Sequence, residues 1–259
     1  MELAFVISGL LVGFVIGLSG VGGGSLMTPL LVMGFGIPPA TAVGTDLLYA
    51  GLTKASCTIF RGKLGSINWK VAVILALGSV PAAIFTSIYF LSPTTLSNET
   101  AQLITRMLGV MLCVTALSLI FRKQLQSVSK RVFRVGAKTQ KTRIMIATLT
   151  LGAVLGILVT LTSVGAGAIG FTALLVLYPQ LPTNHLVGTD IMHAVPLTLI
   201  AGLSHAVAGS VDYQLLFALL IGSIPGVILG SLVAHKIPET LLQWVLGTVL
   251  LLVGLKLLI

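Results

Sequence analysis

The sequence predicts an all-α polytopic membrane protein, because it has few charges, long apolar runs and an internal repeat. Of its 259 residues, 56% are hydrophobic and 8% are charged, whereas soluble domains carry about 25% charged residues. Residues 3–45 contain no formally charged side chain, and about 20 apolar residues suffice for one helical span. The apolar runs lack the alternation of a membrane β-barrel, so helices are the expected way to satisfy the backbone in lipid.

Two halves of the chain are related by an internal repeat. Pro38 and the tetrapeptide 43–46 recur 144 positions later, as Pro182 and 187–190. Upstream of these, the glycine cluster of the first half recurs with an offset of 143, so one residue has been gained or lost before Pro38. We therefore divide the chain into a first repeat (1–121), a basic loop (122–143) and a second repeat (144–259).

Each repeat is expected to contain about five helical segments. In the first repeat these are 3–20, 24–36, 39–60, 70–91 and 101–121, and in the second 144–162, 167–178, 184–207, 213–234 and 240–258. The second segment of each repeat follows a glycine-rich break and has only about 12 residues, a length of about 18 Å. This is shorter than the hydrocarbon core, so we expect a short or broken helix there.

The charged residues predict how the chain is oriented. Eight of its 15 Lys and Arg residues lie between Arg122 and Arg143, which favours a cytoplasmic position for the loop and a membrane protein rather than one that binds nucleic acid. Arg61, Lys63 and Lys70 flank one connection of the first repeat, whereas the matching connection of the second has Asp212 and no Lys or Arg. Opposite charge in equivalent loops predicts inverted repeats, a plan common among secondary transporters.

The two glycine clusters are the first candidate site. Glycine allows a helix to break and to expose amide N–H groups, and the helix that follows points its positive end at the break. Two such breaks that face each other could bind a small oxyanion; the alternative is close helix packing. The candidate substrate-binding residues are Ser19, Gly22, Gly23, Gly24, Ser25, Thr45, Lys54, Thr162, Ser163, Gly165, Gly167 and Thr189.

Asp46 and Asp190 end the two copies of the repeated tetrapeptide. A carboxylate within a span is costly, so it faces protein, water or a partner. Two roles stay open: coupling to an ion such as H⁺, or a structural bond to the glycine loops. Lys54 lies inside a predicted span, where it could neutralise a bound anion, pair loosely with Asp46 or reach the membrane surface.

Histidines on the second repeat are candidates for a proton relay. His193 and His205 lie on one predicted span, where they could titrate near neutral pH or serve in packing. Their spacing does not predict a metal site, and Cys57 and Cys113 fit packing positions. We expect no cofactor and no enzymatic activity. The alternatives are an anion channel or uncoupled facilitator, an intramembrane enzyme that uses the two aspartates, and a scaffold without transport.

The motifs resemble those of the TauE/SafE family of sulfite exporters and anion permeases. The matching residues are Gly17-Leu18-Ser19-Gly20-Val21-Gly22-Gly23-Gly24, Pro29-Leu30-Leu31, Ala42-Val43-Gly44-Thr45-Asp46 and Gly65-Ser66-Ile67-Asn68-Trp69, with their echoes in the second repeat. The resemblance implies a bacterial or archaeal plasma-membrane transporter for sulfite, organosulfonates or thiosulfate. Its expected partners are a small anion, membrane lipid and a coupling H⁺; the sequence predicts no oligomeric state.

Overall fold

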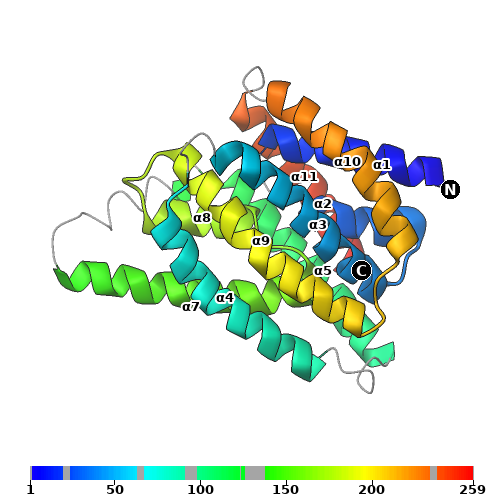
Figure 1. Cartoon of the computed structure of the whole chain (residues 1–259), viewed down its shortest axis with the longest axis horizontal. Helices are drawn as coiled ribbons and strands as arrows, with labels where there is room; N and C mark the ends of the chain where they lie inside the picture. The colour runs from blue at the N-terminus through cyan, green and yellow to red at the C-terminus, as the bar shows by residue number, and fades with distance from the viewer. Residues whose placement is uncertain are drawn as a thin grey trace.

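The computed structural model describes residues 2–19, 24–62, 67–90, 98–122, 124–125, 138–233 and 238–258. Helices make up nearly all of these residues, and no strand occurs among them. The helices are α1 (Glu2–Ser19), α2 (Gly24–Pro29), the π-helix η1 (Leu30–Gly34), α3 (Pro39–Gly62), α4 (Trp69–Phe90), α5 (Asn98–Ile120), α7 (Lys138–Thr162), α8 (Ala168–Leu177), α9 (Thr183–Val207), α10 (Tyr213–Val233) and α11 (Glu239–Leu258). Figure 1 shows them in order along the chain.

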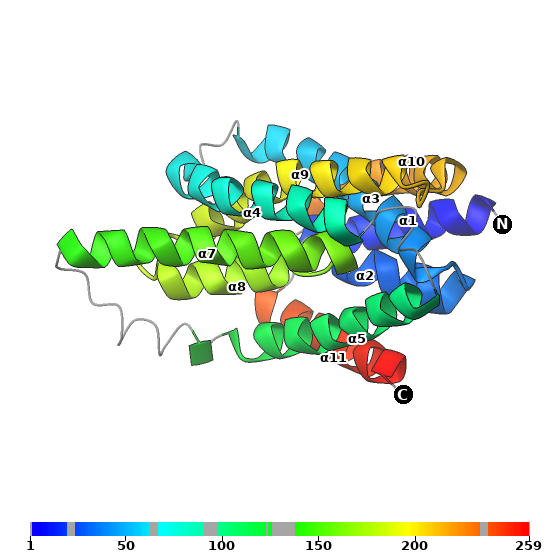
Figure 2. The ribbon, with the colours of Figure 1, turned by 90° about the horizontal axis from the view of Figure 1, so that it is seen from below.

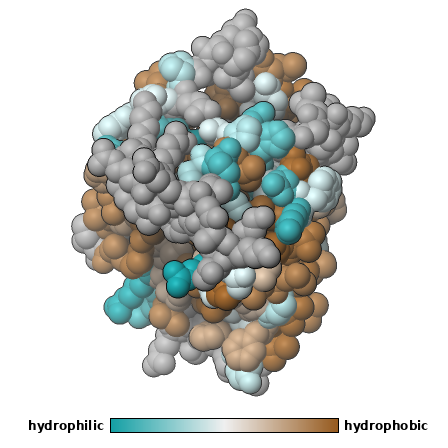
Figure 3. All heavy atoms as spheres, turned by 90° about the vertical axis from the view of Figure 1, so that its left-hand side faces the viewer, coloured by the Kyte–Doolittle hydropathy of each residue, from teal (hydrophilic) through white to brown (hydrophobic). Residues whose placement is uncertain are grey.

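The described helices confirm a polytopic helical membrane protein. Six of them are long and apolar enough to cross a bilayer. Large hydrophobic side chains such as Leu77, Phe85 and Ile221 are exposed on their outer faces, where lipid would cover them. Figure 3 looks at one end of the molecule: hydrophilic residues gather on the described part of that end, and hydrophobic residues cover the flanks.

Helix boundaries fall close to the predicted segments, with one extension. Helix α7 begins at Lys138, inside the stretch 122–143 that the sequence assigns to the basic loop. Residues 138–143 contain Lys, Thr, Gln and Arg but no Gly or Pro. These residues tolerate a helix well enough for α7 to continue beyond its apolar part.

The second segment of each repeat is short, as predicted. Helix α8 has 10 residues and is therefore about 15 Å long, half the thickness of the hydrocarbon core. Helix α2 has six residues and runs into η1. Pro29 stands at this junction, and because proline has no N–H and its ring clashes with the preceding turn, it disturbs the helical ladder where the π-turn begins.

The most extensive helix contacts join one repeat to the other. Helix α1 packs on α10, α4 on α7, α3 on α9 and α5 on α11. Figures 1 and 2 show α3 and α9 side by side in the middle, with α1 and α10 on one flank, α4 and α7 on the other, and α5 and α11 along a further side. Neither repeat therefore forms a separate domain.

Glycine lines the interfaces of α1 with α10 and of α4 with α7, where the helix backbones touch. A Cβ added to Gly13 of α1 would overlap the backbone carbonyl of Ser223 in α10. A Cβ on Gly156 of α7 would overlap the carbonyl of Ser79 in α4. Small residues that admit close backbone approach are the usual means of helix association in lipid. The glycines with such backbone contacts are Gly9, Gly13, Gly17, Gly222, Gly226 and Gly230 between α1 and α10, and Gly78, Gly152 and Gly156 between α4 and α7.

Candidate functional site

Of the two glycine-rich breaks, the structure describes the one in the loop between α7 and α8. Ser163 has φ 58° and Gly165 has φ 116°. This left-handed region is costly for serine, so the surrounding structure must hold Ser163 there. The hydroxyl of Thr162 donates to the Leu158 carbonyl at 2.7 Å and accepts from the Val164 N–H at 3.2 Å. It therefore closes the end of α7, whereas the Ser163 side chain reaches another helix.

Asp46 of α3 joins three segments of the chain. Its carboxylate is fully buried. Oδ2 accepts a hydrogen bond from the hydroxyl of Thr28 in α2 and another, at 2.9 Å, from the hydroxyl of Ser163. Thr28 belongs to the same repeat and Ser163 to the other. Asp46 thus connects α2 and α3 to the opposite glycine loop, through a side chain of that loop rather than through its amides.

Asp190 occupies the equivalent position in α9 but has a different environment. It is 2% exposed, and its Oδ1, like that of Asp46, has no hydrogen-bond partner in the part of the chain that the structure describes. Unlike Asp46, however, it has no hydroxyl donor there. The carboxylate lies against the Cα face of Gly170 in α8, where an added Cβ would overlap Oδ1. The buried hydroxyl of Thr172, in the same helix, also lacks a partner among the described residues.

A one-residue difference in spacing accompanies this contrast. Thr28-Pro29-Leu30-Leu31-Val32 and Thr172-Ala173-Leu174-Leu175-Val176 are matching segments, but Thr28 follows Gly24 by four residues and Thr172 follows Gly167 by five. Each added residue turns a helix by about 100°. In α8 the side that meets the aspartate is therefore occupied by Gly170, and Thr172 lies about 200° further around the helix.

Lys54 is the buried cation of the site. It is 3% exposed, and its Nζ donates to the backbone carbonyl of Ala166 at 2.7 Å. The ammonium is near enough to act electrostatically on Asp46, Asp190 and His193. The side chain stays in the interior, so the alternative in which it reaches the membrane surface is wrong. Lys54 is thus within electrostatic range of one aspartate from each repeat.

The two candidate histidines lie in different places. His193 belongs to the Lys54 group, and its Nε2 is 2.8 Å from the hydroxyl of Ser79 in α4. His205 lies two turns or more along α9, where its Nε2 donates to the Thr160 carbonyl at 2.9 Å. Both Nδ1 atoms are buried and have no partner within the described ranges. The structure therefore does not bring the two rings together as one relay.

Thr45 and Thr189 bind backbone rather than facing a common ligand. Thr45 Oγ1 accepts from the N–H of Asp212 at 3.0 Å, and Thr189 Oγ1 accepts from the N–H of Asn68 at 2.9 Å. Thr189 also donates its proton to the His185 carbonyl at 2.6 Å, so it has no hydroxyl proton left for an anion in this conformation. We call these two bonds the threonine clamps; each ties one repeat to the other.

The residues held by the clamps also begin helices α4 and α10. Asn68 Oδ1 accepts from the N–H of Val71 at 3.3 Å, and Asp212 Oδ1 accepts from the N–H of Leu215 at 3.0 Å. Both are N-cap bonds. The sequence reasoning missed this role, although Asn68 and Asp212 have the same offset of 144 as the repeated tetrapeptides.

Part of the predicted site cannot be placed. Gly22 and Gly23 lie outside the described residues, as does the side chain of Ser19; Gly24 begins α2 and Ser25 is buried. Gly167 precedes α8, where its N–H donates to the Gly165 carbonyl at 2.8 Å. Within the described ranges, no group of three or more His, Cys, Asp or Glu side chains is arranged to hold a metal ion.

Comparison with known proteins gives the family. The family model "Sulfite exporter TauE/SafE" matches residues 5–257. The chain belongs to this family. It is 37% identical over 259 residues to "Probable membrane transporter protein YjnA" of Bacillus subtilis, with 99% of this chain and 100% of the relative covered. "Probable membrane transporter protein YdhB" of the same species is 29% identical over 240 residues, with 90% of each chain covered.

The TauE/SafE relatives extend to the archaea. "Probable membrane transporter protein MJ0441" of Methanocaldococcus jannaschii is 25% identical to this chain over 269 residues, with 98% of this chain and 94% of the relative covered. No solved structure matches. The family resemblance read from the motifs is thus confirmed over nearly the whole chain.

Proposed function

We propose that this TauE/SafE protein is a secondary transporter that carries small sulfur-containing anions, such as sulfite, an organosulfonate or thiosulfate, across a prokaryotic plasma membrane. The observation that carries the proposal is the buried Lys54 ammonium, which joins α3 to the glycine loop of the other repeat. A cation inside a membrane protein is costly and marks ion or substrate paths. The names of the family and of its relatives, all membrane transporters, favour the same function.

A transport role accounts for the site better than an intramembrane enzyme does. Asp46 Oδ2 is engaged by two hydroxyl groups, and Asp190 meets the Cα of a glycine. Asp46 has hydroxyl neighbours, but the described residues provide no third group that orients it as a base, and Asp190 has no hydroxyl beside it there. A shared lysine between two repeats is, in contrast, a reasonable resting place for an anion in transit.

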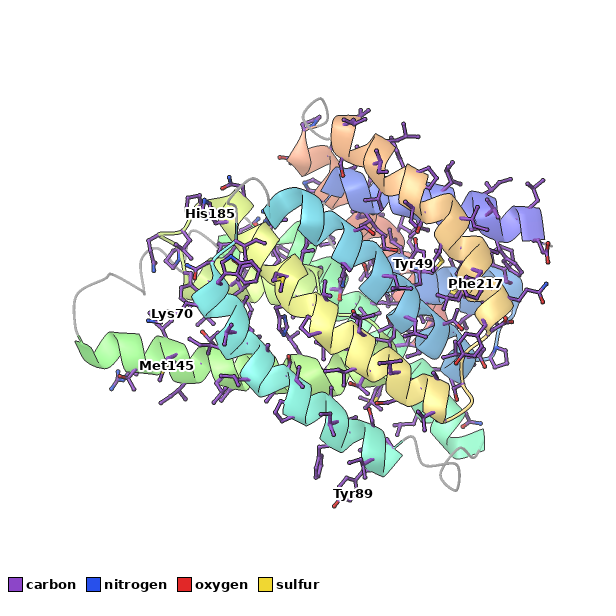
Figure 4. All side chains as sticks on the ribbon, in the orientation of Figure 1. Tyr49, Lys70, Tyr89, Met145, His185 and Phe217 are labelled. Carbon is purple, nitrogen blue, oxygen red and sulfur yellow. The ribbon has the colours of Figure 1, made fainter. Side chains whose placement is uncertain are left out.

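The packing of the repeats supports an inverted arrangement. Helix α4 begins near Lys70 and ends near Tyr89, whereas α10, its counterpart, begins near Phe217 at the other end of the molecule (Figure 4). The threonine clamps link the repeats reciprocally, as a two-fold relation would require. We infer that the repeats have opposite orientations in the membrane and that the Lys54 site is reached from each side in turn.

Flux measurements in proteoliposomes test the function. Vesicles that contain the purified protein should exchange labelled sulfite, thiosulfate or ethanesulfonate at rates well above those of protein-free vesicles. Lys54→Gln should lower the exchange at least tenfold, since it removes the buried charge. Lys70→Gln is the matched control, because Lys70 is exposed at one end of the molecule. Absence of flux for all three anions, or an unaffected Lys54→Gln variant, would refute the proposal.

Two further measurements separate the alternatives. A carrier should show saturable flux that is stimulated by anion on the opposite side, whereas a channel should not. For the topology, single cysteines at Ser66 and Ser129 (both outside the described residues) should be shielded from an impermeant external thiol reagent. A cysteine at Tyr213, which is exposed beside the buried Ser210, should react. The background would lack Cys57 and Cys113. Labelling of the cysteines at Ser66 and Tyr213 from the same side would contradict inverted repeats.

A further inference from the structure

Among the described residues, the charges buried at the crossing of α3 and α9 do not cancel. Lys54 contributes one positive charge, and Asp46 and Asp190 contribute two carboxylates. A buried charge without compensation is strongly unfavourable. One of the two carboxyl groups is therefore expected to hold a proton when the site is otherwise empty, and the structure distinguishes between them.

Asp46 is suited to remain an anion. Its Oδ2 accepts bonds from Thr28 and Ser163, and hydroxyl donors stabilise the charged form of a carboxylate. Ser163 is held in a left-handed conformation while it makes this bond, so the chain accepts local strain to keep the donor in place.

Asp190 lacks any such donor among the described residues. The Oδ1 atoms of Asp46 and Asp190 are both buried without a partner there. The two residues differ in their hydroxyl donors: Asp46 Oδ2 has two, whereas no hydrogen bond to Asp190 occurs among the described residues, and Gly170 lies against its Oδ1. A buried carboxyl group without hydrogen-bond donors is better accommodated in its neutral form.

We propose that Asp190 binds the proton that accompanies the transported anion, whereas Asp46 is a fixed structural anion. The assignment rests on the proposed function. An arriving anion adds a negative charge to the site, so its binding is more favourable when Asp190 is protonated. By linkage, the anion then promotes proton binding to Asp190 to the same extent as the proton promotes anion binding.

The other groups that face Asp190 fit this role. Lys54 acts on it from α3, and His193 lies three residues along α9 with its Nε2 on Ser79 of α4. Helix α8 presents Gly170. The Lys and Arg residues of α4 and α7 lie within the first two turns of these helices: Lys70, Lys138, Lys141 and Arg143. His193 is thus the alternative proton acceptor, and the experiment must separate the two.

Calorimetric titration of the purified protein measures the proton directly. Ethanesulfonate and thiosulfate stay ionised around neutral pH, so the enthalpy of binding in two buffers of different ionisation enthalpy gives the protons taken up per anion. The wild-type protein should take up as much as about one proton per anion. It should also bind the anion more tightly as the pH falls. Asp190→Asn should take up none and have a pH-independent affinity. Uptake that persists in Asp190→Asn, or that is lost in His193→Gln but not in Asp190→Asn, would overturn the assignment.

Gly170→Ala gives a second test that leaves every titratable group in place. The added methyl group would overlap Asp190 Oδ1 and should shift the pH at which affinity changes. Ala173→Val, also in α8, is the control and should leave that pH unchanged. An unchanged profile in Gly170→Ala would contradict the proposal. Exchange in proteoliposomes, measured without a pH gradient, reports separately on the proposed function: if exchange is present but proton uptake is absent, only the coupling proposal fails.

Discussion

Asp46 and Asp190 end two copies of the same tetrapeptide, yet the two carboxylates have different surroundings. Asp46 Oδ2 accepts bonds from two hydroxyl groups, one from each repeat, while Asp190 lies against a glycine. The Oδ1 atoms of both have no partner among the described residues. The neighbouring clamps, Thr45 with Asp212 and Thr189 with Asn68, are in contrast nearly identical. The two repeats thus have equivalent threonine clamps but differ in the surroundings of their aspartates.

The divergence accompanies a small difference in the sequence. Thr172 lies one residue further from its glycine cluster than Thr28 does, and the hydroxyl which reaches Asp46 in the first repeat has no counterpart beside Asp190. Each repeat contributes one aspartate, Asp46 on α3 and Asp190 on α9. A transporter that needs a fixed anion and an ionisable one can therefore obtain both from a single repeated motif, through a change in the helix that packs on it.

The largest loss of stability is expected at the glycine-lined contacts of α1 with α10 and of α4 with α7, where the repeats are most alike. Gly13→Leu and Gly156→Leu each place a side chain against a backbone carbonyl of the facing helix, at a cost of about 3 kcal/mol or more. Both variants should lose most of their monodisperse protein in size-exclusion chromatography. Val154→Leu, at an exposed position of α7, is the control. Collapse of only one of the two would show that the interfaces are not equivalent.

Substitution of the two aspartates should give the next-largest effects on stability, and these effects should differ between Asp46 and Asp190. Asp46→Asn replaces two charge-assisted bonds by weaker ones and should cost roughly 2–3 kcal/mol. Asp190→Asn removes a carboxylate that has no such bonds, so its cost should stay under about 1 kcal/mol. Thermal unfolding in detergent micelles would measure both. Equal losses of stability would end the distinction between a structural and an ionisable aspartate.

Ser163 offers a finer test of the bond to Asp46. Ser163→Ala removes the hydroxyl and keeps a side chain in the left-handed region, whereas Ser163→Gly removes the hydroxyl and the conformational strain together. The glycine variant should therefore be more stable than the alanine variant by about 1 kcal/mol. The first repeat already has glycine, Gly20, at this position. An alanine variant as stable as the glycine variant would argue against strain at Ser163.

Substitutions in the two threonine clamps should give the smallest losses of stability, and the two losses should be equal. Thr45→Val and Thr189→Val keep the side-chain shape and remove the hydroxyl acceptor, at about 1 kcal/mol each. Thr150, an exposed residue of α7, provides a neutral Thr→Val control. Unfolding temperatures that differ strongly between the two clamp variants would mean that the repeats support their helices differently.

The sequence predicted the helices well because their lengths follow from the thickness of a bilayer. It also selected Asp46, Lys54 and Asp190 as candidate site residues, since charges inside apolar segments are costly and stand out. It did not predict their partners. Thr28 and Ser79 reach the site only through contacts between segments far apart in the chain. The repeated Thr-x-Leu-Leu-Val segment, with its altered distance from the glycine cluster, was the available signal for the asymmetry.

Packing between α1 and α10 has a consequence for how the protein is made. The glycine face of α1 (Glu2–Ser19) fits a helix that begins only at Tyr213. At translation rates of about 5–20 residues per second, α1 waits on the order of 10–40 s for its partner to leave the ribosome. During that time the insertion machinery or lipid must cover its glycine face. Every nascent chain that stops before α10 therefore exposes an unmatched helix, which membrane quality control can detect.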